Sequence, residues 1–133
     1  MSRYNPELLP KIRSDRIKQA VQGMPCTLRI SSFLSGHKCS DQSTVIPAHV
    51  RSFGKGVNTK VSDLHVIAAC LHCHDLLDGR DGKWEILLDR YPAAVLQRVI
   101  NAIYETQNMM LSVGAIIVPD AVPIKGEYPR VLP

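Results

Sequence analysis

The four cysteines of this 133-residue chain are the residues whose types and spacing most clearly indicate chemistry. Twelve residues separate Cys26 from Cys39, and two separate Cys70 from Cys73, so the second pair forms a Cys-x-x-Cys turn. Such a turn lets two thiolates bind one tetrahedral ion, and the first pair can supply the other two ligands. The spacing predicts a structural zinc site with four cysteine ligands, which would contribute about 10 kcal/mol to folding.

Other interpretations of the same cysteines stay open at this point. Cys70-Leu71-His72-Cys73-His74 matches the attachment pattern of c-type haem, and a thioredoxin-like dithiol could follow a strand at 66–69. Both interpretations leave Cys26 and Cys39 unexplained. In a third interpretation, the four cysteines are unrelated buried residues of the core. His37, two positions before Cys39, could replace it as a zinc ligand.

The chain carries a formal net charge of +4 and has an isoelectric point near 9.0, which permits a polyanionic partner without requiring one. Residues 42–62 contain no acidic side chain, while Arg51, Lys55 and Lys60 add positive charge close to His49. No apolar run reaches the roughly 20 residues of a membrane-spanning helix, and the N-terminus lacks the apolar segment of a secretion signal. We therefore expect a cytoplasmic protein without a membrane partner.

Hydrophobic periodicity predicts helices at 6–22, 71–79 and 92–113, and strands at 26–30 and 44–50. Pro47 marks the second strand as an edge strand or a bulge. These elements predict an α+β fold in which two short strands and a helix surround the zinc and pack against the long helix. One face of the long helix is apolar and could serve a dimer as easily as a core (Val95, Leu96, Val99, Ile100, Ile103, Met110 and Leu111).

The boundaries of these elements predict three regions along the chain. Residues 1–25 form an N-terminal helical extension, and residues 26–118 form the zinc-stabilised domain that includes the long helix. Residues 119–133 contain three prolines besides the one at 119 and form an irregular tail.

Several motifs together resemble a known family of nucleases. They are Cys26-x-x-Arg29-Ile30, Ala48-His49-x-Arg51, the Gly54-Lys55-Gly56 loop with Lys60, and Ala69-Cys70-x-x-Cys73-His74-Asp75-x-x-Asp78-x-Arg80. This combination resembles the phage and prophage nucleases of the YbcO type, the related RecA-dependent nuclease Ref and, more loosely, the HNH (ββα-metal) endonucleases. The likeness is close from about Cys26 to Arg80 and weaker through Thr106-Gln107.

The resemblance implies a ββα-metal (HNH-like) core with flanking helices that cleaves DNA in phage recombination or replication, with a recombinase filament as a candidate partner. A neutral imidazole can take a proton from water, so His49 would be the general base. Asp63 would brace the segment that carries it. His74 and Asp78 lie four residues apart on a helix and would hold a catalytic Mg²⁺ or Mn²⁺ ion. Arg51, Lys55, Lys60 and Arg80 would contact DNA phosphates.

Each of these residues also has a simpler interpretation. A lone histidine on a strand is more often structural, His74 could sit beside the zinc as a helix-start residue, and Asp75 competes with Asp78 as the carboxylate ligand. HNH enzymes commonly carry an acid or a histidine just before the base, where this chain has Ala48. The alternative function is therefore a zinc-stabilised DNA-binding module without catalysis.

Overall fold

The computed structural model of the chain describes residues 10–50 and 61–124, and the elements within these ranges form an α+β fold. The elements are α1 (Asp15–Val21), β1 (Ile46–His49), β2 (Val66–Ala69), α2 (Leu71–Asp78), α3 (Lys83–Arg90) and α4 (Pro92–Ser112). Short 3₁₀ helices at Ile30–Phe33, Gln42–Thr44 and Asp63–His65 connect them. The expected α+β class is thus confirmed. None of the described helices combines the length and the apolar composition that crossing a membrane requires.

The two strands form a small antiparallel sheet in which Ile46 pairs with Ala69 and His49 pairs with Val66. Pro47 is tolerated because each strand of a two-stranded sheet has an open edge, as the sequence predicts. All four residues of β2 are buried. The sheet therefore places His49 beside the start of β2, while the end of β2 leads directly into α2.

Residues from outside the sheet form hydrogen bonds with the backbone of Ala68 at the open edge of β2. Its carbonyl oxygen accepts hydrogen bonds from the backbone N–H of Thr27 at 2.8 Å and from the Thr27 hydroxyl at 3.1 Å. The amide of Ala68 donates to the hydroxyl of Thr106 at 3.1 Å. Because Thr27 and Thr106 lie on the segment after Cys26 and on α4, these bonds fix both elements to the strand that leads into α2.

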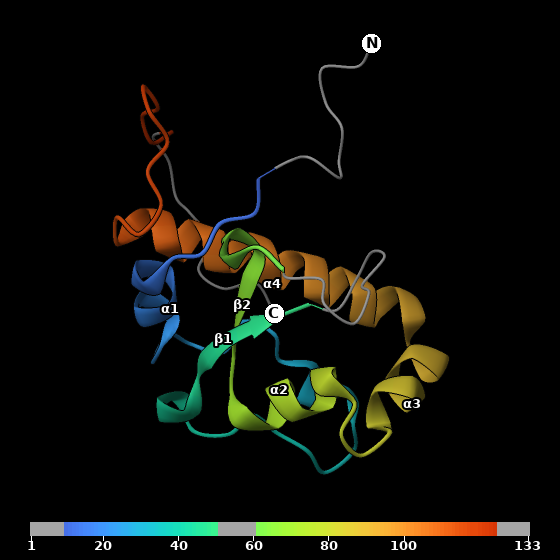
Figure 1. The fold of residues 1–133 in the computed structure, drawn as a ribbon. Coiled ribbons are helices and arrows are strands. Elements are labelled where there is room, and N and C mark those ends of the chain that lie inside the picture. Colours follow the sequence, from blue (N-terminus) through green and yellow to red (C-terminus); the bar gives the residue numbers. More distant parts are fainter. Residues whose placement is uncertain (1–9, 51–60, 125–133) are drawn as a thin grey trace.

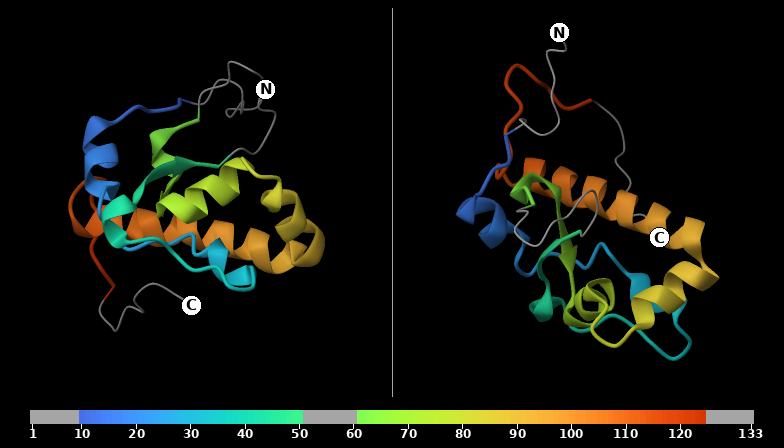
Figure 2. Two further views of the ribbon diagram at one scale, coloured as in Figure 1. Left: turned by 90° about the horizontal axis from the view of Figure 1, so that it is seen from below. Right: turned by 45° about the vertical axis from the view of Figure 1, so that its right-hand side comes forward.

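The long helix α4 supports the rest of the fold (Figures 1 and 2). It contacts β2, α1 and α3, with α1 and α3 lying toward its opposite ends (Figure 1). The Gln107 side chain donates a 3.0 Å hydrogen bond to the carbonyl oxygen of Leu64, in the turn that precedes β2. The sheet, α2 and the turn at Asp63–His65 are therefore positioned against one rigid element.

Two helices end where the sequence predicts. Helix α2 stops at Gly79, whose φ of +69° is the left-handed conformation that glycine favours at a helix C-terminus. Helix α4 begins with Pro92 in its first turn and ends within a residue of the prediction. Its predicted apolar face is only partly core, because Val95 is fully buried whereas Leu96 is 50% exposed.

Three predictions about the elements differ from the structure. The helix predicted at 6–22 is wrong for residues 10–14, because Ser14 caps α1 by accepting a hydrogen bond from the amide of Ile17; residues 6–9 lie outside the described part. The strand predicted at 26–30 is also wrong, since Arg29 adopts a left-handed φ of +47° and the chain turns into a 3₁₀ helix. Helix α3 was not predicted, although it buries Leu87.

Candidate functional site

The four cysteines come from three separate parts of the fold and meet in front of α4. Cys70 follows β2 directly and is the N-cap residue of α2, while Cys73 lies in the first turn of that helix. Both side chains are fully buried. Cys26 and Cys39 come from the two ends of the segment that contains the 3₁₀ helix Ile30–Phe33. The short strand and the helix start therefore bring the Cys-x-x-Cys turn to the other pair.

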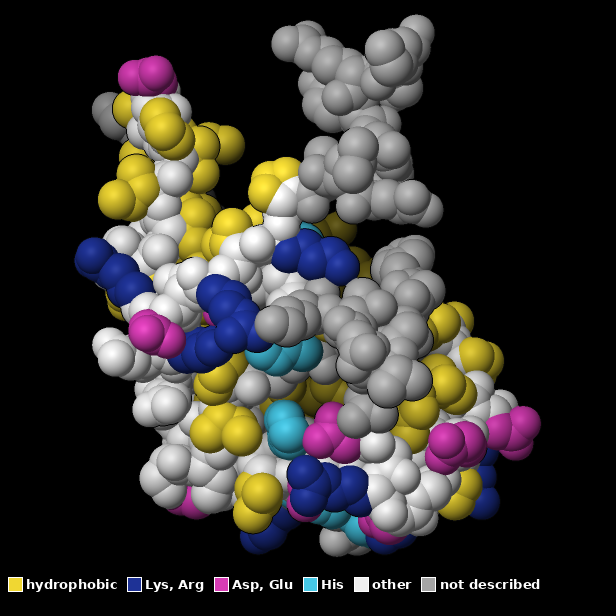
Figure 3. Space-filling view, in the orientation of Figure 1, with side chains coloured by type: hydrophobic (Ala, Val, Ile, Leu, Met, Phe, Trp, Pro, Cys, Tyr) yellow, Lys and Arg dark blue, Asp and Glu magenta, His cyan; other side chains and the backbone are white. Residues whose placement is uncertain are grey.

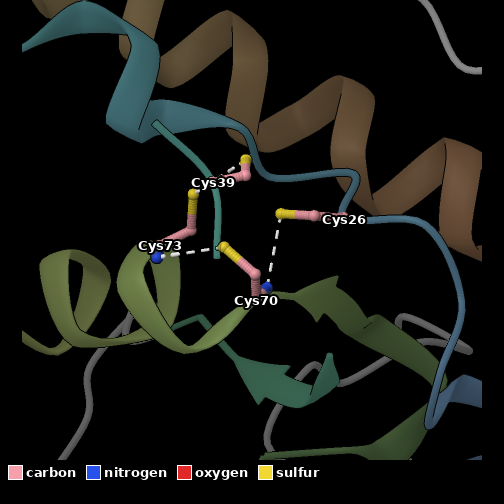
Figure 4. Close-up of side chains that lie close together, drawn as sticks. All are labelled: Cys26, Cys39, Cys70 and Cys73. Carbon is pink, nitrogen blue, oxygen red and sulfur yellow. Dashed lines mark hydrogen bonds between the residues drawn. The ribbon is translucent and has the colours of Figure 1, made fainter. Parts of the chain in front are cut away.

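The sulfur atoms surround a common centre (Figure 4). All four Sγ atoms lie within 4.8 Å of one another, and those of Cys39 and Cys73 are 3.8 Å apart. Four sulfurs bound tetrahedrally to zinc at about 2.3 Å are about 3.8 Å apart, so the donor set fits this ion closely. The predicted cluster of four cysteines is confirmed, and its type and geometry are compatible with a structural zinc site.

Backbone amides point at these sulfurs as they do in zinc-binding turns. The amide of Cys70 donates to Sγ of Cys26 at 3.3 Å, and the amides of Ser40 and Cys73 donate to Sγ of Cys70 at 3.3 and 3.5 Å. Hydrogen bonds to a thiolate stabilise its charged form. The backbone is therefore arranged to receive negative charge on the sulfur atoms.

The pKa values of the thiols move in opposite directions, as expected for like groups that share one site. Burial raises the pKa of the Cys39 thiol to about 11. Hydrogen bonds with Cys26 and Cys70, together with burial, raise the pKa of Cys73, whereas hydrogen bonds from Cys26 and Cys73 lower that of Cys70. Because thiolates repel one another, four of them this close need a cation at their centre to ionise together.

His37, the alternative zinc ligand, has another partner. Its Nδ1 atom lies 2.8 Å from Nε2 of His72, and the two rings stack with their centroids 4.9 Å apart. The thiol of Cys39 occupies the fourth position of the cluster instead. The convergence of all four sulfurs also favours a metal site over interpretations that use only Cys70 and Cys73.

His49, at the end of β1, is held by a carboxylate. Its Nε2 atom lies 2.9 Å from Oδ1 of Asp63, whose side chain is 3% exposed. The other oxygen of Asp63 accepts the amide of Ser14 at 2.7 Å and lies 3.8 Å from Nζ of Lys18. Burial raises the pKa of Asp63, but the hydrogen bonds from Ser14 and His49 and the charge of Lys18 outweigh it and lower the pKa overall. Asp63 is thus an ionised anchor for the imidazole.

A second histidine–carboxylate pair lies on α2. Nδ1 of His74 is 3.3 Å from Oδ2 of Asp78, one helical turn later, and both side chains are 19% exposed. Arg80 lies 3.8 Å from Asp78 and 3.6 Å from Asp75, so it bridges the two carboxylates. Figure 3 shows histidine side chains over the end of β1 and over α2 on one face, bordered by acidic and basic side chains.

The remaining predicted residues of this face are not all described. Arg51, Lys55 and Lys60 lie outside the described residues. Ser14, which binds Asp63, and Thr106, which binds β2, were not singled out as site residues by sequence reasoning. The capping preference of serine before an amphipathic helix was the available signal for Ser14. For Thr106, the sequence offered no signal beyond its place in the weaker part of the family resemblance.

The comparisons with known proteins give one match. A family model described as "Putative nuclease YbcO" matches residues 15–114, which is well over half of the chain and includes the four cysteines, His49, Asp63, His74 and Asp78. No curated protein and no solved structure matches the chain.

Proposed function

The chain belongs to the family described as "Putative nuclease YbcO", and from this membership we propose that it is a metal-dependent DNA endonuclease of the HNH type. The family gives the chain a nuclease-type function and a nucleic acid substrate. The observation that carries the finer proposal is the 2.9 Å hydrogen bond between His49 and Asp63 at the start of β2, the strand whose other end leads into the four-cysteine cluster.

His49 is the proposed general base. With its Nε2–H donating to Asp63, the imidazole keeps Nδ1 as the atom that accepts a proton from the attacking water. The side chain is 36% exposed, so water and substrate can reach the ring while the carboxylate behind it stays buried. Asp63 is a positioning residue that fixes the tautomer and orientation of the base.

His74 and Asp78 are the proposed ligands of the catalytic ion. The two donors lie 3.3 Å apart on one face of α2, and an imidazole with a carboxylate suits Mg²⁺ or Mn²⁺ when water and a phosphate oxygen complete the shell. Such an ion supplies charge stabilisation for the 3′ oxygen that leaves the phosphate. Arg80 next to Asp78, together with Arg51, Lys55 and Lys60, is proposed to contact the phosphates of DNA.

The wider biological role follows from the family resemblance rather than from geometry. We propose action on DNA in phage or prophage recombination or replication, in the host cytoplasm, with a recombinase filament as a candidate partner. The exposed apolar residues of α4, such as Leu96 and Ile100, leave a homodimer as a further proposal. The zinc-stabilised nuclease domain is proposed to span residues 26–118, between an N-terminal extension (1–25) and a C-terminal tail (119–133).

A DNA-binding module without catalysis is the competing function, and one observation favours it. Ala48, directly before His49, is 1% exposed and carries no group that could bind an ion. A site with only His74 and Asp78 as protein ligands would hold its ion weakly. A protein in which this ion never binds would keep the same basic side chains for contact with DNA.

Cleavage at different Mg²⁺ concentrations separates the two functions, with Asp78→Asn and Asp75→Asn as a matched pair on α2. The nuclease proposal predicts cleavage of single-stranded or duplex DNA that requires Mg²⁺ or Mn²⁺. Asp78→Asn should need a much higher concentration of the ion, whereas Asp75→Asn should behave like the unmodified protein. DNA binding without cleavage at any concentration of either ion would support the binding module instead.

A further inference from the structure

A pocket of about 610 Å³ lies between α4 and the segment from Arg29 to Cys39. None of its lining residues belongs to β1, β2 or α2, the elements that carry His49 and His74, and the pocket borders the cysteine cluster through Cys39. Three cationic side chains line it, those of Arg29, Lys38 and Arg98, and no carboxylate does among the residues that the structure describes. The pocket is thus a concave surface with positive charge on both walls.

The carboxylate of Glu105 binds both arginines of the pocket. Glu105 accepts a 3.1 Å hydrogen bond from Arg29 through Oε1 and binds Arg98 through Oε2. Among the residues that the structure describes, one carboxylate is therefore shared by two guanidinium groups that line the pocket. Burial and the charge of Arg29 lower the pKa of Arg98, which is the effect that a bound anion would oppose.

Arg29 has two features of a residue constrained for binding. Its φ of +47° is a left-handed conformation that is unfavourable for a residue with a side chain. Its Nε atom is buried and makes no hydrogen bond to any residue that the structure describes. An oxyanion in the pocket would bring hydrogen-bond acceptors to this guanidinium group.

The rest of the lining offers an apolar and a hydrogen-bonding surface. Phe33 also lines the pocket and supplies an aromatic side chain. On the opposite wall, one turn of α4 carries Gln97 and Asn101, whose amides share a 3.0 Å hydrogen bond. A nucleotide carries groups that match this lining. Its phosphate can bind guanidinium groups, and its base can stack on an aromatic ring and form hydrogen bonds with amides.

We propose that this pocket binds a nucleotide, with its phosphate against Arg29, Arg98 and Lys38 and its base against Phe33. The choice of a nucleotide among phosphate-bearing ligands rests on the nuclease family, whereas the binding of an oxyanion rests on the pocket alone. The nucleotide can belong to a DNA strand or be free. Binding here requires neither His49 nor a catalytic ion.

The test measures binding of deoxyadenosine 5′-monophosphate, inorganic phosphate and a short single-stranded oligonucleotide to the zinc-loaded full chain without added Mg²⁺. Isothermal titration calorimetry gives the affinities. Lys38→Glu changes an exposed lining residue and should weaken binding of the nucleotide about fivefold or more. Ala94→Trp fills the pocket from an exposed position on α4 and should abolish binding.

Two matched controls keep the test specific. Ala93→Trp alters the neighbouring exposed position, which does not line the pocket, and Arg16→Glu reverses an exposed charge near Gly114, beyond the far end of α4. Both should bind the nucleotide like the unmodified protein. Tighter binding of the oligonucleotide than of the monophosphate would identify a DNA strand as the source, and the reverse would identify a free nucleotide.

Two results would overturn the proposal. One is the absence of measurable binding of all three ligands, and the other is equal binding in Ala94→Trp and Ala93→Trp. If phosphate binds in the pocket and nucleotides bind no better, the oxyanion site stands and the nucleotide assignment is wrong. Because no step of this test involves cleavage, a protein that fails to cut DNA at His49 can still pass it.

Discussion

Nε2 of His49 lies 2.9 Å from Oδ1 of Asp63, and this hydrogen bond joins the end of β1 to the turn that precedes β2. Asp63 also accepts the amide of Ser14 at 2.7 Å, at the start of α1. One buried carboxylate thus connects three segments and the proposed base. The same contacts that stabilise the fold at this point also fix the orientation of the imidazole.

Asp63→Asn should lower the free energy of unfolding by about 1–3 kcal/mol, because a neutral amide gives up the charge-assisted hydrogen bonds with Ser14 and His49. Urea unfolding at pH 7 measures the change. Asp81→Asn is the matched control, since Asp81 is an exposed carboxylate in a turn, and it should change stability by less than about 0.5 kcal/mol. Equal effects of the two substitutions would show that Asp63 is not an anchor.

The stability that Asp63 contributes should not depend on pH between about pH 5.5 and 8. Its pKa is lowered in the folded protein from 3.8, so its contribution is complete above 3.8 and is lost only as the pH falls through the lower, folded pKa. The difference in unfolding free energy between the unmodified protein and Asp63→Asn measures this contribution. If that difference shrinks between pH 7 and 5.5, the pKa of Asp63 is raised rather than lowered.

The four-cysteine cluster should bind one zinc ion per chain, as measured by elemental analysis, and cobalt substitution should give the absorbance of tetrahedral thiolate ligation. Cys73→Ser should lose most of the bound zinc and unfold at a much lower temperature, because metal binding supplies folding free energy. Ser31→Ala is the control, since its hydroxyl contacts the sulfurs of Cys39 and Cys73 without belonging to the cluster. Full zinc content in Cys73→Ser would contradict the site.

Thr106→Val should destabilise the protein by about 1–3 kcal/mol although it keeps the shape of the side chain. The hydroxyl of Thr106 is buried, accepts the amide of Ala68 and bonds the hydroxyl of Thr27, so valine leaves these polar groups without that partner. Thermal unfolding measures the loss. Ser112→Ala removes an exposed hydroxyl near the end of the same helix and should have little effect.

Much of the four-cysteine cluster could be predicted from the sequence because its evidence is local. The Cys-x-x-Cys turn fixes two ligands within one helical turn, and Gly79 marks the end of that helix. The involvement of Cys26 could be inferred from the number of cysteines and from the family motif, because the distance between Cys26 and Cys70 in the chain gives no geometry. The structure supplies it through the amide of Cys70, which donates to the Cys26 sulfur.

The strand predicted at 26–30 shows why the rest could not be predicted. Polar and apolar residues alternate from Cys26 to Ile30, which is typical of a strand. Of these residues, only Thr27 forms a backbone hydrogen bond with β2. The left-handed conformation of Arg29 then turns the chain away. Arg29 forms a hydrogen bond with Glu105 on α4. The two residues lie 76 positions apart in the chain, so no local pattern can reveal this contact.

The apolar face predicted on the long helix has a similar explanation. Hydrophobic periodicity identifies an apolar stripe along a helix, but it does not tell how much of that stripe is covered by neighbouring elements. β2, α1 and α3 pack against α4, and Val95 and Met110 are fully buried, whereas Leu96 and Ile100 remain about half exposed. The positions of the elements that pack against α4, rather than the sequence of α4 itself, decide which of its apolar residues become part of the core.

The most direct test of the proposed nuclease is the rate of DNA cleavage by His49→Ala compared with His65→Ala. His65 is an exposed histidine in the turn before β2, so its replacement controls for the loss of an imidazole nearby. We predict that His49→Ala binds DNA normally but cleaves it at least about 100-fold more slowly, while His65→Ala cleaves within about twofold of the unmodified protein. Equal cleavage rates in the two variants would contradict the assignment of His49 as the base.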